Sequence, residues 1–296
     1  MKSDAERWLI TGASGQLGSH LIRQLAGDPH APTLLALVGR GSTGTPGVHE
    51  ERVDLADADG LRRCVERFRP THVLHVGAMS AVADCHERPY DAERINAEAT
   101  RVLAQVAAAG GARLVYTSTD MVFAGDAAPY RETDRPRPLS IYGRTKLEGE
   151  QAVAVFDRSL VVRLPLMYGF PLSTRETTFT KQIAALRRGE PLKLFGDEFR
   201  TPVWLSDAAA ALIGLARSEL AGLIHVAGPE RLSRYELIEG CARLLGIESP
   251  RLAAVSRNSI ASPEPRPADL SLDGARFARL LPELAPRPVR PAVFAC

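Results

Sequence analysis

The sequence has few cysteines, no long apolar segment and almost no net charge. Its 296 residues include only four cysteines, none of them in a CxxC pair: Cys64, Cys85, Cys241 and Cys296. We therefore expect reduced thiols in a cytoplasmic protein, and neither a disulfide framework nor a metal site. No segment approaches the roughly 18 consecutive apolar residues of a membrane span. The polar start of the chain does not resemble a signal peptide, so no membrane partner is expected.

The charge balance excludes a further class of partners. Lysine and arginine together number 37 and aspartate and glutamate 35, a net charge of +2. A dedicated nucleic-acid-binding protein carries a strong basic excess, so we expect no nucleic-acid partner. Apolar residues make up 45% of the chain and charged residues 24%, which are ordinary proportions for a folded globular protein. At about 150 residues per domain, the length fits two domains or one large α/β unit with an appendage.

The first half of the chain alternates short apolar segments with helical patterns, as in βαβ units. Strands are expected at residues 8–11, 34–38, 72–76, 113–118 and 160–163. Helices are expected at residues 16–26, 57–69, 91–109 and 139–156. Several of the strands are apolar on both faces, which is typical of parallel strands covered by helices on both sides. Residues 1–165 therefore predict an α/β fold, a Rossmann-type doubly wound parallel sheet that binds NAD(P).

Proline and glycine interrupt this alternation after residue 165. Helices are still expected at residues 178–188, 206–217 and 233–245. Residues 250–296 carry eight of the 21 prolines, so we expect short elements and irregular structure there. We predict that residues 166–296 form a smaller substrate-binding lobe. This lobe would cover the carboxyl edge of the sheet and be intertwined with the first lobe rather than independent.

A glycine-rich turn joins the first expected strand to the first expected helix. Gly12, Gly15 and Gly18 have the spacing G-x-x-G-x-x-G. In dinucleotide-binding turns the first glycine permits the tight turn, the second lets the backbone approach the pyrophosphate, and the third lets the helix pack closely. A tight turn without a ligand is the alternative, but the position at the first strand–helix junction favours a dinucleotide. The residues expected to bind it here are Gly12, Ser14, Gly15, Gln16, Leu17 and Gly18.

The end of the second strand bears on which dinucleotide is bound. Arg40 follows this strand, and no carboxylate occurs between it and Glu50. An acidic residue here binds the ribose 2′-hydroxyl of NAD, whereas an arginine accommodates the 2′-phosphate of NADP. The sequence therefore favours NADP over NAD, with a solvated surface charge as the other interpretation of Arg40. Further along the chain, the residues expected to border the cofactor are Asp54, Leu55, Gly77, Ala78 and Met79.

A tyrosine and a lysine follow the fourth strand at a spacing of four residues. Tyr142 and Lys146 would lie on one face of a helix. A free phenol has a pKa near 10, and a neighbouring cation lowers it toward the range useful for acid–base catalysis. The strand itself ends in Ser118 and Thr119, and a hydroxyl there can hydrogen-bond a substrate carbonyl oxygen. We favour Thr119 for this role over Ser118, with ordinary strand-end capping as the alternative.

Together these motifs resemble the extended branch of the short-chain dehydrogenase/reductase superfamily. Within that branch the chain is similar to the dTDP-4-dehydrorhamnose reductases and other sugar-nucleotide-binding reductases. The resemblance rests on the T-G-x-x-G-x-x-G and Y-x-x-x-K motifs and on three longer segments, residues 118–123, 138–150 and 266–273. It covers nearly the whole chain.

The resemblance implies a reaction: NADPH-dependent reduction of the C4 carbonyl of a nucleotide-linked 4-keto-6-deoxy sugar. It assigns the catalytic roles to Thr119, Tyr142 and Lys146. Tyr142 would protonate the reduced oxygen, Lys146 would hold the nicotinamide ribose and lower the pKa of Tyr142, and Thr119 would hydrogen-bond the reacting oxygen. Pro165 lies in a segment similar to the one that passes the nicotinamide. The implied substrate contacts are Ser80, Thr119, Asp120 and Arg200, with Arg200 either binding the diphosphate or carrying a surface charge.

Two departures from the family pattern leave alternatives open. The reductases usually carry an aromatic residue and a carboxylate after the third strand, and residues 77–83 have neither. Asp120 is followed by Met121, so the Asp-Glu pair of the sugar dehydratases is also missing. The alternatives are an NAD(P)-dependent epimerase, a reductase of another carbonyl compound, or a non-catalytic NADP-binding regulatory subunit resembling the methionine adenosyltransferase β subunit. The expected partners are a nucleotide sugar and a second copy of the chain in a homodimer.

Overall fold

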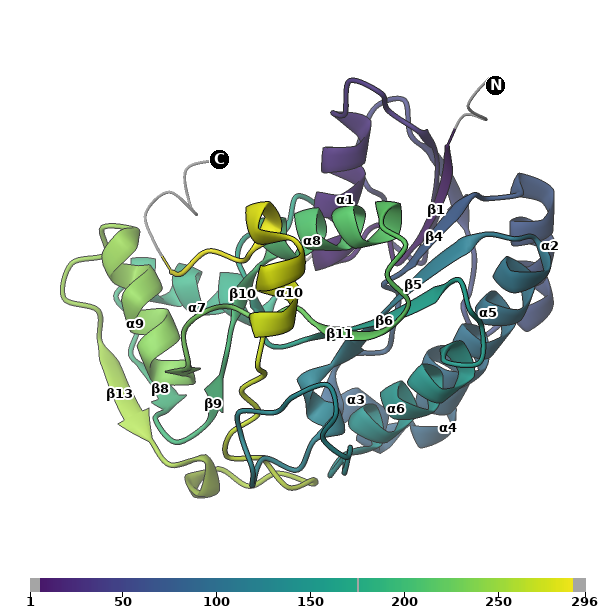
Figure 1. Ribbon diagram of the computed structural model, residues 1–296. Coiled ribbons are helices and arrows are strands. Elements are labelled where there is room, and N and C mark those ends of the chain that lie inside the picture. Colours follow the sequence, from purple (N-terminus) through teal and green to yellow (C-terminus); the bar gives the residue numbers. More distant parts are fainter. Residues whose placement is uncertain (1–5, 175, 290–296) are drawn as a thin grey trace.

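A seven-stranded parallel sheet forms the centre of the protein (Figure 1). The computed structural model describes residues 6–174 and 176–289, so Cys296 lies outside the described residues. The strands are β1 (Arg7–Thr11), β2 (Thr33–Val38), β3 (His49–Arg52), β4 (His72–His75), β5 (Arg113–Thr119), β6 (Ser159–Leu164) and β11 (Gly222–His225). Their order in the sheet is β11-β6-β5-β4-β1-β2-β3, and every neighbouring pair is parallel. The predicted Rossmann-type doubly wound sheet is thereby confirmed.

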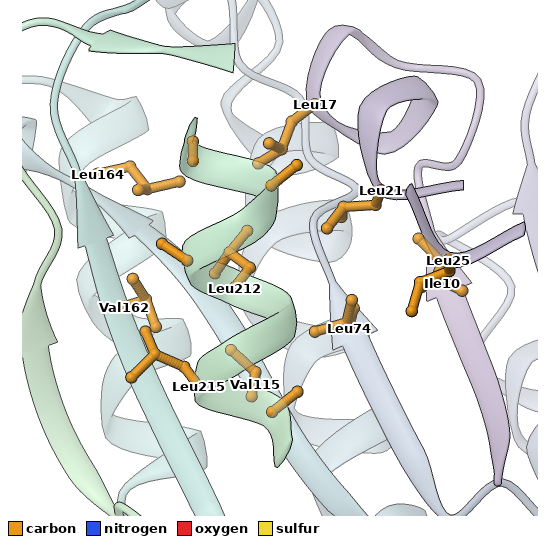
Figure 2. Close-up of a cluster of buried hydrophobic side chains, with 14 of the residues drawn as sticks. Ile10, Leu17, Leu21, Leu25, Leu74, Val115, Val162, Leu164, Leu212 and Leu215 are labelled. Carbon is orange, nitrogen blue, oxygen red and sulfur yellow. The ribbon is translucent and has the colours of Figure 1, made fainter. Parts of the chain in front are cut away.

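Helices cover both faces of this sheet. One face is packed by α1 (Gln16–Ala26) and α8 (Leu205–Arg217), and the other by α2 (Ala58–Phe68), α5 (Ala99–Ala109) and α6 (Ile141–Val153). Figure 2 shows how Leu212 and Leu215 of α8 lie over Val115 and Val162 of the strands. These side chains are fully buried or nearly so. Their removal from water provides the main stabilisation of this layer.

The chain reverses its direction of winding between β1 and β4. It winds outward through β2 and β3, returns to place β4 on the other side of β1, and continues through β5 and β6. Loops diverge where strand order reverses, so a crevice forms at the carboxyl ends of the two central strands. Gly12 and Gly77 follow these two strands, which places the glycine-rich turn at this crevice.

The second half of the chain builds a smaller lobe beside the carboxyl edge of the sheet. It contains α7 (Thr178–Arg187), α9 (Arg234–Leu244) and three two-stranded sheets: β7 (Met167–Tyr168) with β10 (Val203–Trp204), β8 (Leu192–Phe195) with β13 (Leu252–Val255), and β9 (Phe199–Arg200) with β12 (Leu232–Ser233). Tyr168, Phe179, Trp204 and Leu237 belong to its separate hydrophobic core. Residues 251–289 consist of short elements, as expected, and include α10 (Ala275–Leu280).

The two lobes are intertwined along the chain. Residues of the second half supply α8 to one face of the sheet and β11 to its edge. The boundary placed at residue 165 stays a prediction. Among residues 6–174 and 176–289 no helix is long and apolar enough to cross a membrane.

The predicted strands and helices agree with the structure to within a few residues, with three informative differences. The helix expected at residues 91–109 consists of α4 (Pro89–Glu93), a π-helical turn at Arg94–Glu98, and α5. A short helix, α3 (Val82–Glu87), was not expected. Strands β3 and β11 were also missed. The sequence of β3 is His-Glu-Glu-Arg and has no apolar alternation that would predict a strand. Backbone pairing with β2 makes this segment a strand.

Candidate active site

A cavity of about 750 Å³ lies between the carboxyl edge of the sheet and the second lobe. Gln16, Ser80 and Tyr142 line it from the first lobe. The charged side chains that line it from the second lobe are Glu176, Lys193, Glu198, Arg200, Arg234, Glu264 and Arg266. Such concave sites between lobes are where small molecules bind in open α/β folds. The cavity therefore joins three predicted site residues of the first lobe to Arg200 of the second.

The glycine-rich turn has the geometry that a dinucleotide requires. Gly12 has a φ of +64°, and a Cβ there would lie 2.6 Å from the Cα of Gly77. A Cβ on Gly18 would lie 2.2 Å from the carbonyl oxygen of Gly12. Both positions therefore exclude a side chain, the first by its backbone conformation as well as by contact. Gly12 and Gly18 thus have the geometry that the sequence predicted for them: a tight turn at Gly12 and close packing of the helix at Gly18.

The start of α1 is suited to bind an anion. Gly15 is the N-cap of this helix and provides no side-chain cap. The first N–H groups of a helix have no partner inside the helix, and its N-terminus carries a partial positive charge. Gln16 begins the helix and lines the cavity, and Leu17 is buried behind it. These residues fit the pyrophosphate of a dinucleotide.

The residues expected near the adenosine lie on loops beside this turn. A Cβ on Gly41 would lie 3.3 Å from the Ser14 hydroxyl, so the loop that carries Arg40 is next to the glycine-rich turn. Arg40 itself is exposed. The nearby carboxylates already have partners: Glu50 accepts hydrogen bonds from the backbone and hydroxyl of Thr43, and Asp54 accepts one from the Ala56 backbone. The loop thus offers a cation, and no unbonded carboxylate, to a ribose 2′-substituent.

Leu55, Gly77, Ala78, Met79 and Pro165 lie around the crevice. Leu55 contacts Gly77, because a Cβ on that glycine would lie 2.8 Å from the Leu55 Cδ1. Ala78 and Met79 are half-buried and Pro165 is buried. The structure thus brings Gly12, Leu55 and Gly77 into direct contact at the switch point.

Helix α6 holds Tyr142 and Lys146 against the end of β5. Ser140 is its N-cap and accepts a hydrogen bond from the Gly143 backbone at 3.1 Å. A Cβ on Gly149 would lie 2.2 Å from the Tyr116 hydroxyl, so the glycine lets the helix approach the strand closely. Tyr116 also donates a hydrogen bond to the Lys146 carbonyl at 3.2 Å. The pair is therefore fixed by backbone contacts rather than by a flexible loop.

Thr119 and Tyr142 come together in this site. The Thr119 hydroxyl, at the end of β5, donates a hydrogen bond to Asp120 at 3.0 Å and interacts with the Tyr142 phenol, which lowers the pKa of that phenol. Burial raises the pKa of Tyr142 well above its usual value, the charge of Asp120 adds to this, and the bond with Thr119 opposes it. The sequence predicted a lowered pKa for this phenol, and in the structure the pKa of Tyr142 is raised instead. Desolvation and the charge of Asp120 outweigh the effect of Thr119, so Tyr142 holds its proton at neutral pH.

Lys146 shows the opposite effect of burial. Its side chain is buried, with Nζ 4.1 Å from the centre of the Tyr116 ring. Burial lowers its pKa to about 7, against the opposing effect of Glu150. The Glu150 carboxylate is itself bound by Arg163 through two hydrogen bonds of 2.8 and 2.6 Å. Lys146 therefore titrates near neutral pH. A small change in the charge around it would alter the fraction of Lys146 that is protonated.

Asn96 lies in the π-helical turn and fixes the segment behind the cofactor crevice. Its side-chain amide accepts a hydrogen bond from the Met79 backbone N–H at 2.9 Å and donates one to the Met79 carbonyl at 3.0 Å. It also donates to the Thr145 hydroxyl at 3.1 Å, beside Lys146. π-helical turns often occur at functional sites. The sequence predicted a continuous helix here and gave no signal for this turn.

A buried charge cluster connects Thr119 to the second lobe. The Asp120 carboxylate lies 3.2 Å from Arg200 Nε, and Arg200 also approaches Glu198 at 3.3 Å. Glu198 in turn accepts a hydrogen bond from Arg234 at 2.9 Å. Burial raises the pKa of Asp120 and Arg200 opposes this. Arg200 is 4% exposed, so the interpretation as a surface charge is wrong.

Six charged cavity residues had no role in the sequence-based predictions: Glu176, Lys193, Glu198, Arg234, Glu264 and Arg266. They come from separate parts of the second lobe, and only tertiary contacts bring them together. Arg266 lies within one of the segments that carries the family resemblance, which is the only signal that could have identified it. Within residues 6–174 and 176–289, no group of three or more His, Cys, Asp or Glu side chains is arranged to hold a metal ion.

Comparison with known proteins gives a consistent result. Residues 6–295 match the RmlD substrate binding domain family. A probable dTDP-4,6-dihydroxy-2-methyloxan-3-one 4-ketoreductase of Streptomyces antibioticus is 32% identical over 88% of this chain and 85% of its own. The crystal structure of dTDP-4-dehydrorhamnose reductase from Bacillus anthracis in complex with NADP superimposes with a TM-score of 0.82 and 25% identity, covering 94% of this chain and 93% of that chain.

A relative of another kind is similar to a nearly equal degree. Methionine adenosyltransferase 2 subunit beta of Bos taurus is 30% identical over 93% of this chain and 82% of its own. The same fold and a similar sequence are therefore found in a protein described as a subunit of another enzyme. Similarity of fold does not by itself decide between these functions.

Proposed function

This chain belongs to the RmlD substrate binding domain family, and from that membership we propose that it reduces a nucleotide-linked 4-keto-6-deoxy sugar with NADPH. It is an NAD(P)-dependent oxidoreductase of the extended short-chain dehydrogenase/reductase type. The observation that carries the proposal is the Tyr142 phenol, which lines the cavity on the same helix as the buried Lys146 and interacts with the Thr119 hydroxyl.

Tyr142 acts as the proton donor in this proposal. A group that donates a proton at neutral pH must hold that proton beforehand, and burial keeps the phenol of Tyr142 protonated. Thr119 would orient the reacting oxygen, because its hydroxyl interacts with the phenol of Tyr142 and would turn from Asp120 to hydrogen-bond the carbonyl. The two side chains would bind the carbonyl oxygen on one side and deliver a proton to it as negative charge develops.

Lys146 and the glycine-rich turn hold the cofactor. NADPH supplies a hydride when bound. Gly12, Gly15 and the first turn of α1 would bind its pyrophosphate, and Arg40 its 2′-phosphate. Lys146 would donate hydrogen bonds to the nicotinamide ribose, and its ammonium, when protonated, would stabilise negative charge on the phenol oxygen after the proton has left.

The second lobe would bind the nucleotide diphosphate. Arg200 lines the cavity and stays a proposed contact, but its charge is already shared by Asp120 and Glu198. Arg266 instead donates to backbone carbonyls, among them Ile260, and stacks over a phenylalanine ring. Its full positive charge and that of Lys193 therefore remain to attract phosphate.

Spectrophotometry tests the proposed reaction. Oxidation of NADPH, and separately of NADH, would be followed with a panel of nucleotide-linked 4-keto-6-deoxy sugars. We expect turnover with NADPH, and we expect Tyr142→Phe to reduce kcat about 100- to 10,000-fold through loss of the proton donor. The control is Tyr90→Phe, an exposed tyrosine away from the cavity, which should keep wild-type activity. Wild-type turnover that survives in Tyr142→Phe would contradict the role of the phenol.

A second function is favoured by the similarity to the methionine adenosyltransferase subunit. A regulatory subunit would bind NADP without turning over any sugar in the panel and would co-purify with a larger partner. Calorimetric binding of NADPH together with an absence of turnover would favour this alternative over the reductase.

A further inference from the structure

Glu264 reaches from the second lobe to the start of the catalytic helix. Its Oε1 accepts a hydrogen bond of 2.9 Å from the backbone N–H of Ile141, the residue before Tyr142. The same oxygen lies 3.5 Å from Nδ1 of His86 on α3. The side chain is 8% exposed. A carboxylate at this position is stabilised by the N-terminal end of α6, which carries a partial positive charge.

The other oxygen of this carboxylate has no such partner. Oε2 of Glu264 is buried and makes no hydrogen bond with any of the described residues. Glu264 nevertheless lines the cavity, together with Tyr142 and Ser80. Burying a carboxylate oxygen without a donor is costly, and buried polar atoms of native proteins almost always have a partner. The unpartnered oxygen therefore requires a donor that the described residues do not supply, and a ligand in the cavity that Glu264 lines is such a donor.

Anchoring the helix does not account for this residue. Ser140 already caps α6 by accepting from the Gly143 backbone. The Ile141 N–H needs a single acceptor, which Oε1 provides, and any neutral amide oxygen could serve equally. His86 also approaches Oε1, so both known partners of this carboxylate are on one oxygen and the second oxygen has none.

The position also matches a gap in the first lobe. Ala81, Val82 and Ala83, in the segment after β4, line the cavity and carry no carboxylate. Glu264 supplies a carboxylate to the same cavity from the other lobe. The cavity thus contains a carboxylate near Tyr142 that comes from the second lobe and not from the segment after β4.

We infer that Glu264 is a specificity-determining residue whose Oε2 accepts a hydrogen bond from the sugar hydroxyl beside the reacting carbonyl. The inference rests on the proposed function, because Tyr142 marks where the carbonyl lies and the neighbouring ring hydroxyl is the nearest donor on such a sugar. A carboxylate accepts hydrogen bonds only, so it favours a hydroxyl donor and disfavours substrates that lack one at this carbon.

Binding and turnover are measured together to test this role. The ligands are a dTDP-linked 6-deoxyhexose and its 3-deoxy analogue, titrated calorimetrically with NADP⁺ present, and the corresponding 4-keto sugars assayed with NADPH. The variants are Glu264→Gln, which keeps an amide oxygen for Ile141 but exchanges the second oxygen for a donor, and Glu264→Ala. The matched control is Ser140→Ala, which weakens the start of the same helix without removing a group that lines the cavity.

We expect both Glu264 variants to weaken binding of the hydroxylated sugar about 10- to 100-fold. Binding of the 3-deoxy analogue should change less than about threefold, so the preference for the hydroxyl is lost. Ser140→Ala should affect the two ligands equally. The inference is overturned if the Glu264 variants weaken both ligands equally, or if the wild-type protein binds neither ligand. Selective binding without wild-type turnover would support the role of Glu264 and contradict the reductase function.

Discussion

Lys146 is a buried lysine whose environment disfavours its charge. Its pKa falls to about 7 because burial removes water from the ammonium, and Glu150 compensates only partly. In the proposed function this cost is offset because Lys146 would hold the cofactor ribose and stabilise charge on the phenol of Tyr142. Functional sites often combine such a group with lower stability of the fold.

The pH dependence of stability reports this cost. An unfolded lysine keeps its proton up to about pH 10.4, whereas folded Lys146 releases it near pH 7. Between these values the unfolded state binds more protons, so the free energy of unfolding contributed by this group rises with pH, by about 1.4 kcal/mol per pH unit. Lys146→Met should remove that rise. Urea denaturation of both proteins between pH 7.5 and about 9.5 would measure the difference, and parallel curves would contradict the prediction.

Helix α6 is positioned by close contact between backbone and strand. Gly149 faces the Tyr116 hydroxyl, and the Asn96 carbonyl lies 3.0 Å from where a Cβ would be. One side of the helix thus touches β5 and the π-helical turn at the same time. Tyr142 and Lys146, two turns and one turn earlier in the same helix, are held in place by this contact.

Substitution of Gly149 tests that relation. In Gly149→Ala the methyl group would overlap Tyr116, so α6 must move away from β5; we expect about 1–3 kcal/mol lower stability and a kcat reduced about tenfold or more. Tyr116→Phe in the same chain removes the overlapping hydroxyl and should restore part of both. Gly110→Ala, where a Cβ meets only ordinary contacts, serves as control. Unchanged kcat in Gly149→Ala would show that this contact does not position the pair.

The whole molecule depends on both halves of the chain for its central sheet. Helix α8 packs against α1 and the strands on one face, and β11 extends the sheet beyond β6. Arg287 near the end of the described chain binds Asp207 of α8 with hydrogen bonds of 3.0 and 2.6 Å. The lobes therefore share a core layer instead of meeting at a surface.

This sharing predicts the behaviour of fragments. Residues 1–165 expressed alone would leave the apolar face beneath α8 exposed and the β6 edge unpaired. We expect this fragment to lack a cooperative thermal transition, measured by circular dichroism, whereas co-expression with residues 166–296 should restore one. A fragment 1–165 that unfolds cooperatively on its own would show instead that the first lobe is an independent domain.

Much of this arrangement follows from local patterns. The apolar strands, the helix limits and the glycine-rich turn are specified by periodicity, caps and backbone conformation, all of which act over a few residues. The order of the elements, with the glycine motif first and the Tyr142–Lys146 pair after the fourth strand, pointed to the family. Strand β3 could not be predicted in this way, because its backbone pairing with β2 rather than its side chains makes it a strand.

The sequence by itself determined the doubly wound fold, the dinucleotide turn and the identity of Thr119, Tyr142 and Lys146 as candidates. Only the tertiary structure decided the electrostatics of the site. Burial raises the pKa of Tyr142 and lowers that of Lys146, and it turns Arg200 inward toward Asp120. It also brought Glu264 to the start of α6 across 123 residues of chain. Desolvation and long-range contact depend on what surrounds a group in space, which neighbours in sequence do not specify.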